Sequence, residues 1–219
     1  MYKLLIGILS TTFLLAACED PAANKPKATT SDPTSNSNIV ATSNANAAPK
    51  QGEVLAIDNE NSKVSFIGSK VTGKHDGGFN KFTGNINLVT GKPEDSSVTV
   101  DIDVASVYTD TDGLTKHLQT TDFFDVSKFP KATFTSRKII ADNAAGPGKY
   151  TITGDLDLRG AKKTVTFPAT ITVTDADVAV NSEFSINRKD FGILYAGKAD
   201  DLIRDDVVIK LDLKAPRKK

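Results

Sequence analysis

Apolar and polar residues alternate with a period of two over most of the chain from about Glu53 to about Ala215. In the stretch SVTVDIDV, residues 97–104, every second residue is a valine or isoleucine. Such a period is typical of β-strands with one buried and one solvated face. About eight or nine segments of this kind follow one another without the long crossovers that parallel strands require. The pattern predicts an all-β domain whose antiparallel sheet closes on itself or packs against a second sheet.

The stretch HLQTTDFFDVSKFP, residues 117–130, interrupts this alternation. Three phenylalanines fall within seven residues there, among them Phe123 and Phe124. The preceding DGLTKHLQ can form a short helix, and Pro130 favours an extended entry into the next strand. We expect a helical connection across one end of a barrel, with Leu118, Phe123 and Phe124 turned inward. They would act either as a lid over a cavity or as a plug in a filled core.

Residues 1–17 are typical of a secretory signal peptide, with one lysine, a mostly apolar run and two final alanines. The run is shorter than the roughly 18–20 residues of a transmembrane helix. The ending Leu-Ala-Ala-Cys resembles a bacterial lipobox. The resemblance implies that Cys18 carries diacylglycerol on its sulfur, follows the cleavage site and is N-acylated. An ordinary signal peptide with a chance cysteine is the alternative.

The segment after the cysteine is rich in Ala, Asn, Ser, Thr and Pro and poor in large apolar residues. Such a composition buries too little apolar surface to offset the entropy lost on ordering. We therefore expect residues 18–51 to be a lipidated cysteine followed by a disordered tether of roughly 30 Å average span. The β domain is expected over residues 52–216, and residues 217–219 form a basic tail.

Lysine and arginine total 27 and aspartate and glutamate total 27, so the formal net charge is zero and nothing favours nucleic acid as a partner. Once Cys18 is lipidated, no thiol remains for a disulfide, a nucleophile or a metal. The two histidines, His117 and His75 (the latter in an expected glycine-rich loop), are far apart in sequence, so no metal site is expected. No nucleophile elbow or phosphate-binding loop occurs, and we expect no enzyme.

Two specific stretches, DFFDVSKFPKATFTS (residues 122–136) and INRKDFGI (residues 186–193), resemble the YceI-like domain family. The likeness covers most of the chain from Glu53 to Ala215. It implies an extended antiparallel eight-stranded lipocalin-like barrel with a short helical insert. It also implies a periplasmic or lipid-anchored protein of the bacterial cell envelope that binds a polyisoprenoid-type lipid. No cofactor is expected other than such a bound isoprenoid lipid or a quinone.

The expected ligand contacts are inward-facing apolar residues of the strands and of the helical connection. They are Phe66, Phe82, Val100, Ile102, Leu118, Phe123, Phe124, Phe134, Ile152, Phe167 and Phe184. Each could equally be ordinary core. Arg188 could meet a polar head group, although an isolated arginine more often ties a loop to a barrel rim.

The leading hypothesis is a membrane-tethered protein that holds an isoprenoid-type or related amphiphilic lipid in an apolar tunnel. An eight-stranded barrel has room for one ligand or is filled by its own side chains. The alternative is therefore a non-catalytic structural or interaction module with a filled core. An enzyme that acts on a bound lipid would need polar groups that converge inside the barrel, and we rank it last.

Overall fold

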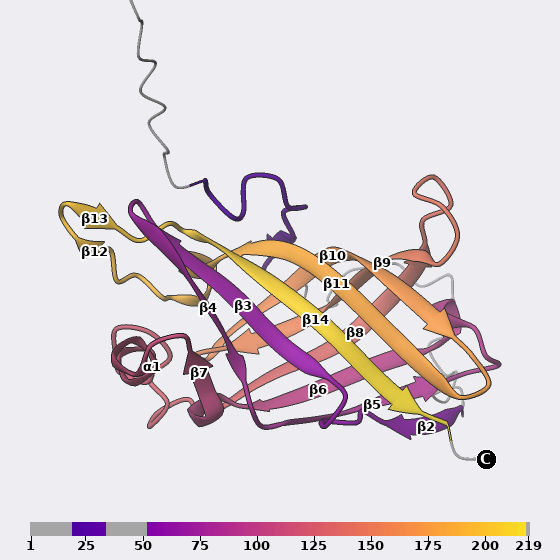
Figure 1. Cartoon of the computed structure of the whole chain (residues 1–219). Helices are drawn as coiled ribbons and strands as arrows, with labels where there is room; N and C mark the ends of the chain where they lie inside the picture. The colour runs from indigo at the N-terminus through magenta and orange to yellow at the C-terminus, as the bar shows by residue number, and fades with distance from the viewer. Residues whose placement is uncertain (1–18, 34–51, 218–219) are drawn as a thin grey trace, which may run out of the picture.

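The computed structural model describes residues 19–33 and 52–217, which form a β-barrel with a short helix at one end (Figure 1). Its helical elements are α1 (Asp112–Leu118) and the 3-10 turns η1 (Pro93–Asp95), η2 (Val104–Ser106) and η3 (Arg188–Phe191). Its strands are β1 (Thr29–Ser31), β2 (Glu53–Ala56), β3 (Lys63–Lys70), β4 (Gly73–Phe79), β5 (Phe82–Leu88), β6 (Ser97–Asp103), β7 (Val107–Thr109), β8 (Lys131–Ala141), β9 (Lys149–Leu158), β10 (Ala161–Val173), β11 (Asp177–Asn187), β12 (Gly197–Lys198), β13 (Asp201–Leu202) and β14 (Asp206–Pro216).

The wall of the barrel is one antiparallel sheet with the order β2-β5-β6-β8-β9-β10-β11-β14-β3-β4-β7. The ends of this order meet through the chain itself, because β4 leads into β5 and β6 leads into β7 after short bends. The bends are bonded to each other, since the amide of Asn80 donates to Ser106 O and that of Asp103 donates to Lys81 O. The expected antiparallel barrel is confirmed. Its sheet has twelve strands rather than eight, because two wall strands are bent and β1 and β2 are added.

Strand β4 corrects the expectation of a loop around His75. Its sequence GKHDGGF lacks apolar alternation, yet β4 pairs with β3 on one side and with β7 on the other. The ring nitrogen Nδ1 of His75 lies 2.8 Å from a carboxylate oxygen of Asp110. The glycines of β4 therefore belong to a strand that neighbouring backbones approach closely.

The interruption at residues 117–130 is a helical connection, as expected. Helix α1 follows β7, and turns then lead from Gln119 to Pro130 and into β8. Leu118 and Phe123 are buried at this end of the barrel. Thr111 is the N-cap residue of α1. It has an extended backbone conformation, and its side chain makes no capping hydrogen bond.

The first described residues do not form the expected tether. Residues 19–33, which we call the N-terminal strap, lie against the barrel wall, and β1 pairs with residues 164–166 of β10. The amide of Ser185 in β11 donates to Pro26 O, and the amide of Ala28 donates to Ser185 O. Strand β10 pairs with β11 only from Thr170 onward. The strap therefore fills a gap in the wall, and the tether prediction is wrong for these residues. The rest of that prediction, residues 34–51, lies outside the described residues.

A buried carboxylate braces the outer face of the wall where β8 has a register shift between Ser136 and Lys138. Asp155 of β9 accepts hydrogen bonds from Arg137 Nη2 at 2.6 Å and from Thr164 Oγ1 at 2.9 Å. Burial raises the pKa of Asp155, but these bonds and the nearby positive charges outweigh burial, so the pKa lies below its usual value. The bulged arginine is thereby fixed to the neighbouring strand.

Candidate ligand-binding site in the barrel interior

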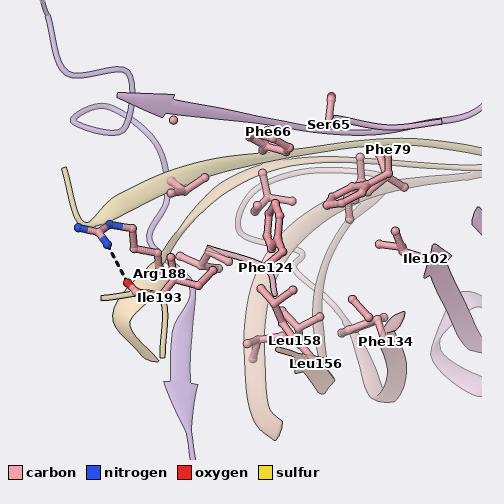
Figure 2. Close-up of a pocket in the computed structure, with 18 of the residues that line it drawn as sticks. Ser65, Phe66, Phe79, Ile102, Phe124, Phe134, Leu156, Leu158, Arg188 and Ile193 are labelled. Atoms are coloured by element: carbon pink, nitrogen blue, oxygen red, sulfur yellow. Dashed lines mark hydrogen bonds between the residues drawn. The ribbon is translucent and has the colours of Figure 1, made fainter. Parts of the chain in front are cut away.

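The two halves of the barrel interior differ. In the half that holds β2 and the β8–β9 turn, side chains such as Ile86, Val98 and Ile139 are buried in a packed core. In the half that holds α1 and η3, the interior contains a cavity of about 210 Å³. Figure 2 shows Phe66, Phe79 and Phe124 in this half, with Arg188 and Ile193 at one end of the cavity and Ile102 and Phe134 toward the other. The barrel is therefore only partly filled by its own side chains.

Almost the whole cavity surface is apolar. Phe66 of β3, Phe79 of β4 and Phe124 of the helical connection surround one part, with ring centroids 5.8–6.4 Å apart. These separations are in the favourable range for tilted and edge-on aromatic pairs. A cavity with this lining favours an apolar ligand, because it offers almost nothing to replace the hydrogen bonds of a polar one.

Two glycines let phenylalanine rings lie flat on the wall. A Cβ atom at Gly77 would come within 2.5 Å of the ring of Phe66. A Cβ atom at Gly154 would overlap the ring of Phe134 and come within 2.6 Å of Thr135 O. The ring of Phe134 thus occupies the space that a side chain at Gly154 would need. Both glycines keep aromatic rings out of the cavity centre.

The helical connection supplies the cavity with Leu118, Phe123 and Phe124. Phe123 also packs outward against His117 and Tyr195, with ring centroids 4.9 and 5.4 Å away. The side chains therefore cover a cavity, which agrees with the lid alternative rather than with a plug in a filled core.

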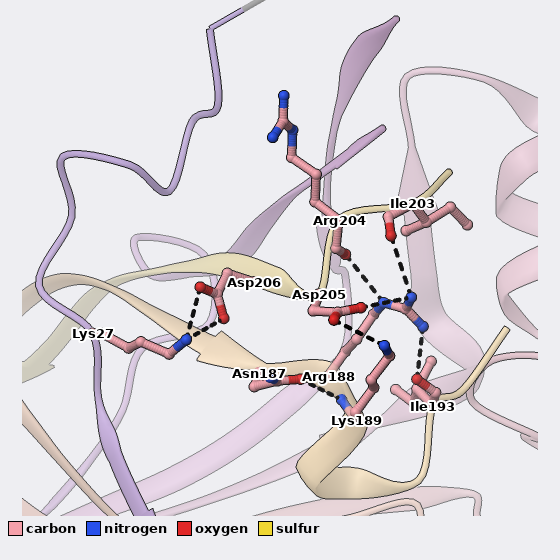
Figure 3. Close-up of polar contacts among 9 residues, drawn as sticks. All are labelled: Lys27, Asn187, Arg188, Lys189, Ile193, Ile203, Arg204, Asp205 and Asp206. Carbon is pink, nitrogen blue, oxygen red and sulfur yellow. Dashed lines mark hydrogen bonds and ion pairs between the residues drawn. The ribbon is translucent and has the colours of Figure 1, made fainter. Parts of the chain in front are cut away.

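Arg188 lies at the rim of the cavity, and only 4% of its surface is exposed. Its guanidinium group donates to the carbonyl oxygens of Arg204, Ile193 and Ile203 and to the carboxylate of Asp205 (Figure 3). Burial lowers the pKa of Arg188, and the charge of Asp205 opposes this shift. These contacts support the structural reading of Arg188, which fastens the segment between η3 and β14 to the barrel.

All the expected contact residues except two line this cavity. Phe82 and Ile152 are buried in the core without lining the cavity. Residues that the sequence did not single out also line the cavity: Val64, Ser65, Gly68, Phe79, Ala132, Leu156, Leu158, Val165, Ile186, Ile193, Ile203, Val207, Ile209 and Leu211. Several of them follow one another at every second position of a strand, such as Leu156 and Leu158 in β9 and Val207, Ile209 and Leu211 in β14. The alternation of apolar residues could therefore have identified them.

Residues 19–33 and 52–217 contain no group of three or more histidine, cysteine, aspartate or glutamate side chains arranged to hold a metal ion. Within these same ranges, no helix has the length and apolar character needed to cross a membrane. Cys18, the expected lipidation site, lies outside them.

Comparison with known proteins agrees with the architecture. The model of the YceI-like domain family matches residues 55–215. A UPF0312 protein of Pseudomonas putida strain W619 is 31% identical over 167 residues, which cover 74% of this chain and 82% of that protein. The crystal structure of Burkholderia cenocepacia BcnA is 29% identical, with a TM-score of 0.65 over 73% of this chain and 99% of that one.

A more distant likeness extends to a domain from Saccharophagus degradans described as polyisoprenoid-binding. It superposes with a TM-score of 0.60 at 18% identity and covers 76% of this chain and all of that one. At this identity the likeness concerns the fold alone.

Proposed function

This chain belongs to the YceI-like domain family, and from that premise we propose that it is a membrane-tethered lipid-binding protein. The ligand is an isoprenoid-type or related amphiphilic lipid, such as a prenyl lipid or a quinone. It lies in the apolar cavity between the helical connection and the packed half of the barrel. The observation that carries the proposal is this cavity, which is lined almost only by hydrocarbon and aromatic groups.

The size of the cavity sets how much of a lipid fits without rearrangement. An apolar cavity of about 150 Å³ binds benzene, and the cavity here is about 210 Å³. An isoprene unit or a quinone ring is close to benzene in size, so the structure accommodates one such group directly. A longer chain requires the aromatic rings around Phe124 to turn aside.

Apolar burial supplies the affinity. Each buried CH₂ group contributes about 0.8 kcal/mol relative to water, so each isoprene unit of five carbons contributes about 4 kcal/mol. Association costs an estimated 4–15 kcal/mol, so a ligand with several units inside the barrel is needed for firm retention. The free energy of apolar burial also makes the escape of a prenyl chain into water slow, and it favours direct exchange of the chain with a membrane.

The proposal includes the lipid anchor and the cell envelope. The signal-like sequence and the lipobox-like ending before Cys18 support both. It assigns no catalytic step to the barrel. The polar group at the cavity rim, Arg188, already donates to three carbonyl oxygens and a carboxylate.

Lipid mass spectrometry of the purified full chain tests this function. We expect a co-purifying prenyl lipid or quinone that is displaced by added polyprenol. A chain that is free of lipid after gentle purification and also takes up neither prenyl lipids nor quinones would overturn the proposal and favour the filled-core alternative.

A further inference from the structure

The N-terminal strap is fixed beside the rim of the cavity. Arg204 Nη1 lies 3.3 Å from a carboxylate oxygen of Asp20, and Lys25 Nζ lies 3.0 Å from one of Glu183. Ala22 packs in a small cluster with buried Ile67 and Val208. Together with the backbone bonds to β11, these contacts hold both the start and the middle of the strap on the barrel.

This attachment limits where a lipid anchor on Cys18 can lie. Cys18 precedes Asp20 by two residues in the sequence, and two residues of chain span at most about 7 Å. The partner of Asp20 is Arg204, and the residue before it, Ile203, lines the cavity. Residues 34–51, the remainder of the expected tether, come after the strap and therefore do not separate the anchor from the barrel.

The same end of the barrel exposes large apolar side chains. Val71, in the turn between β3 and β4, is 55% exposed, Leu202 of β13 is 49% exposed, and Leu194, after η3, is 65% exposed. The two hairpins are joined, since the amide of Val71 donates to Leu202 O. Figure 1 shows these hairpins at one end of the barrel and β2 toward the other. We call these three residues the apolar rim.

We propose that the apolar rim docks on the surface of the lipid bilayer in which Cys18 is anchored, so that the rim end of the cavity faces the membrane. The inference rests on the proposed function and names the partner of the same site. The strap that positions the anchor precedes the stretch matched by the family model, residues 55–215. Contact with the bilayer lets a prenyl chain pass between membrane and cavity without crossing water. Lys70 of β3 and Asp201 of β13 form an ion pair between the two hairpins, which pairs two of the charges beside the rim residues.

Site-specific labels on the full acylated chain test this orientation. Cys18 is the only cysteine and its sulfur is blocked by the lipid, so an introduced cysteine takes a fluorescent label uniquely. Val71→Cys, Leu194→Cys and Leu202→Cys report on the rim. Ile140→Cys is the matched control, because Ile140 is also an exposed large apolar residue, 46% exposed, but lies next to the β8–β9 turn. The protein is reconstituted in phosphatidylcholine vesicles with nitroxide-bearing lipids.

We expect strong nitroxide quenching of the three rim labels and at least a fivefold weaker effect at Ile140→Cys. Equal and weak quenching at all four positions would overturn the proposal, as would mass spectrometry showing an unmodified Cys18 in the mature protein.

Two insertion variants test whether the strap, rather than simple tethering through residues 34–51, sets the orientation. A Gly/Ser insert of about 20 residues, roughly 25 Å in average span, is placed either between Cys18 and Glu19 or within residues 34–51. We expect the first insert to lower rim quenching to the control level and the second to leave it unchanged. Equal effects of the two inserts would contradict the role of the strap.

The outcomes for docking and for lipid binding are independent, because quenching does not require an occupied cavity. Strong rim quenching in a protein that never retains a lipid would overturn the proposed function and leave the docking orientation standing. Retained lipid together with weak rim quenching would overturn the docking orientation and leave the proposed function standing.

Discussion

Replacement of Gly154 by alanine is expected to push the ring of Phe134 into the cavity. The new methyl group would overlap this ring and come within 2.6 Å of Thr135 O, a backbone atom that cannot move aside freely. The ring therefore has to leave the wall, and the cavity that it lines offers free space. The change should lower stability and lipid capacity together.

The magnitude follows from the overpacking. An added methyl in a well-packed position costs about 1–3 kcal/mol. For a domain of this size, each kcal/mol lowers Tm by about 2–4 °C, so we expect a loss of about 2–12 °C. Gly68→Ala is the matched control, because Gly68 also lines the cavity in a strand but a Cβ atom there meets nothing within 4 Å. The control should be neutral, or more stable by up to about 1 kcal/mol.

Thermal unfolding followed by circular dichroism measures the stability, and lipid mass spectrometry measures retained prenyl lipid per protein chain. We expect Gly154→Ala to lose both relative to Gly68→Ala. If the two variants unfold at the same temperature and retain equal amounts of lipid, the assignment of Gly154 as the space for Phe134 is refuted.

Three further substitutions probe other parts of the structure. Phe124→Ala should lower lipid retention and cost about 3 kcal/mol in the free energy of unfolding, the low end of the range for phenylalanine because Phe124 is only partly buried and borders the cavity. Unchanged retention in the same mass spectrometry assay would exclude Phe124 from the site. Asp155→Asn should cost about 1–3 kcal/mol at pH 7 in urea unfolding. The pKa of Asp155 is lowered in the folded state. Its contribution to the free energy of unfolding is therefore present above the ordinary pKa of about 3.9 and is lost as the pH falls through the folded-state pKa. The difference in stability between Asp155→Asn and wild type should vanish in acid, and a difference that does not depend on pH would contradict this. Arg188→Lys, which cannot reproduce four separate hydrogen bonds, should speed amide hydrogen exchange between Ile193 and Arg204 without altering which lipid is bound; altered lipid choice with unchanged exchange would assign Arg188 to head-group recognition instead.

The alternation of residues predicted the barrel well, because each strand has one face in the interior and one in solvent. Alternation does not encode position along the barrel axis. Phe82 and Ile152 face inward as Phe66 and Phe134 do, but they do not line the cavity. Whether an inward side chain lines a cavity depends on which residues of other strands lie at the same height, and that is set by register.

The N-terminal strap shows a second limit of sequence patterns. Its composition indicates disorder because few large apolar residues are present. What holds it is backbone hydrogen bonding to Ser185 and to residues 164–166, together with ion pairs such as Lys25–Glu183. The gap between β10 and β11 that accepts it is a property of the folded sheet, and it leaves no signature in the strap itself.

Photo-crosslinking with a prenyl lipid that carries a diazirine in its chain tests the central claim most directly. The claim predicts adducts in peptides that contain Phe66 and Phe124, with none in peptides that contain Ile86 from the packed half, and loss of these adducts when excess polyprenol is added. Adducts confined to the outer surface, or adducts that polyprenol does not displace, would contradict a lipid site in the barrel.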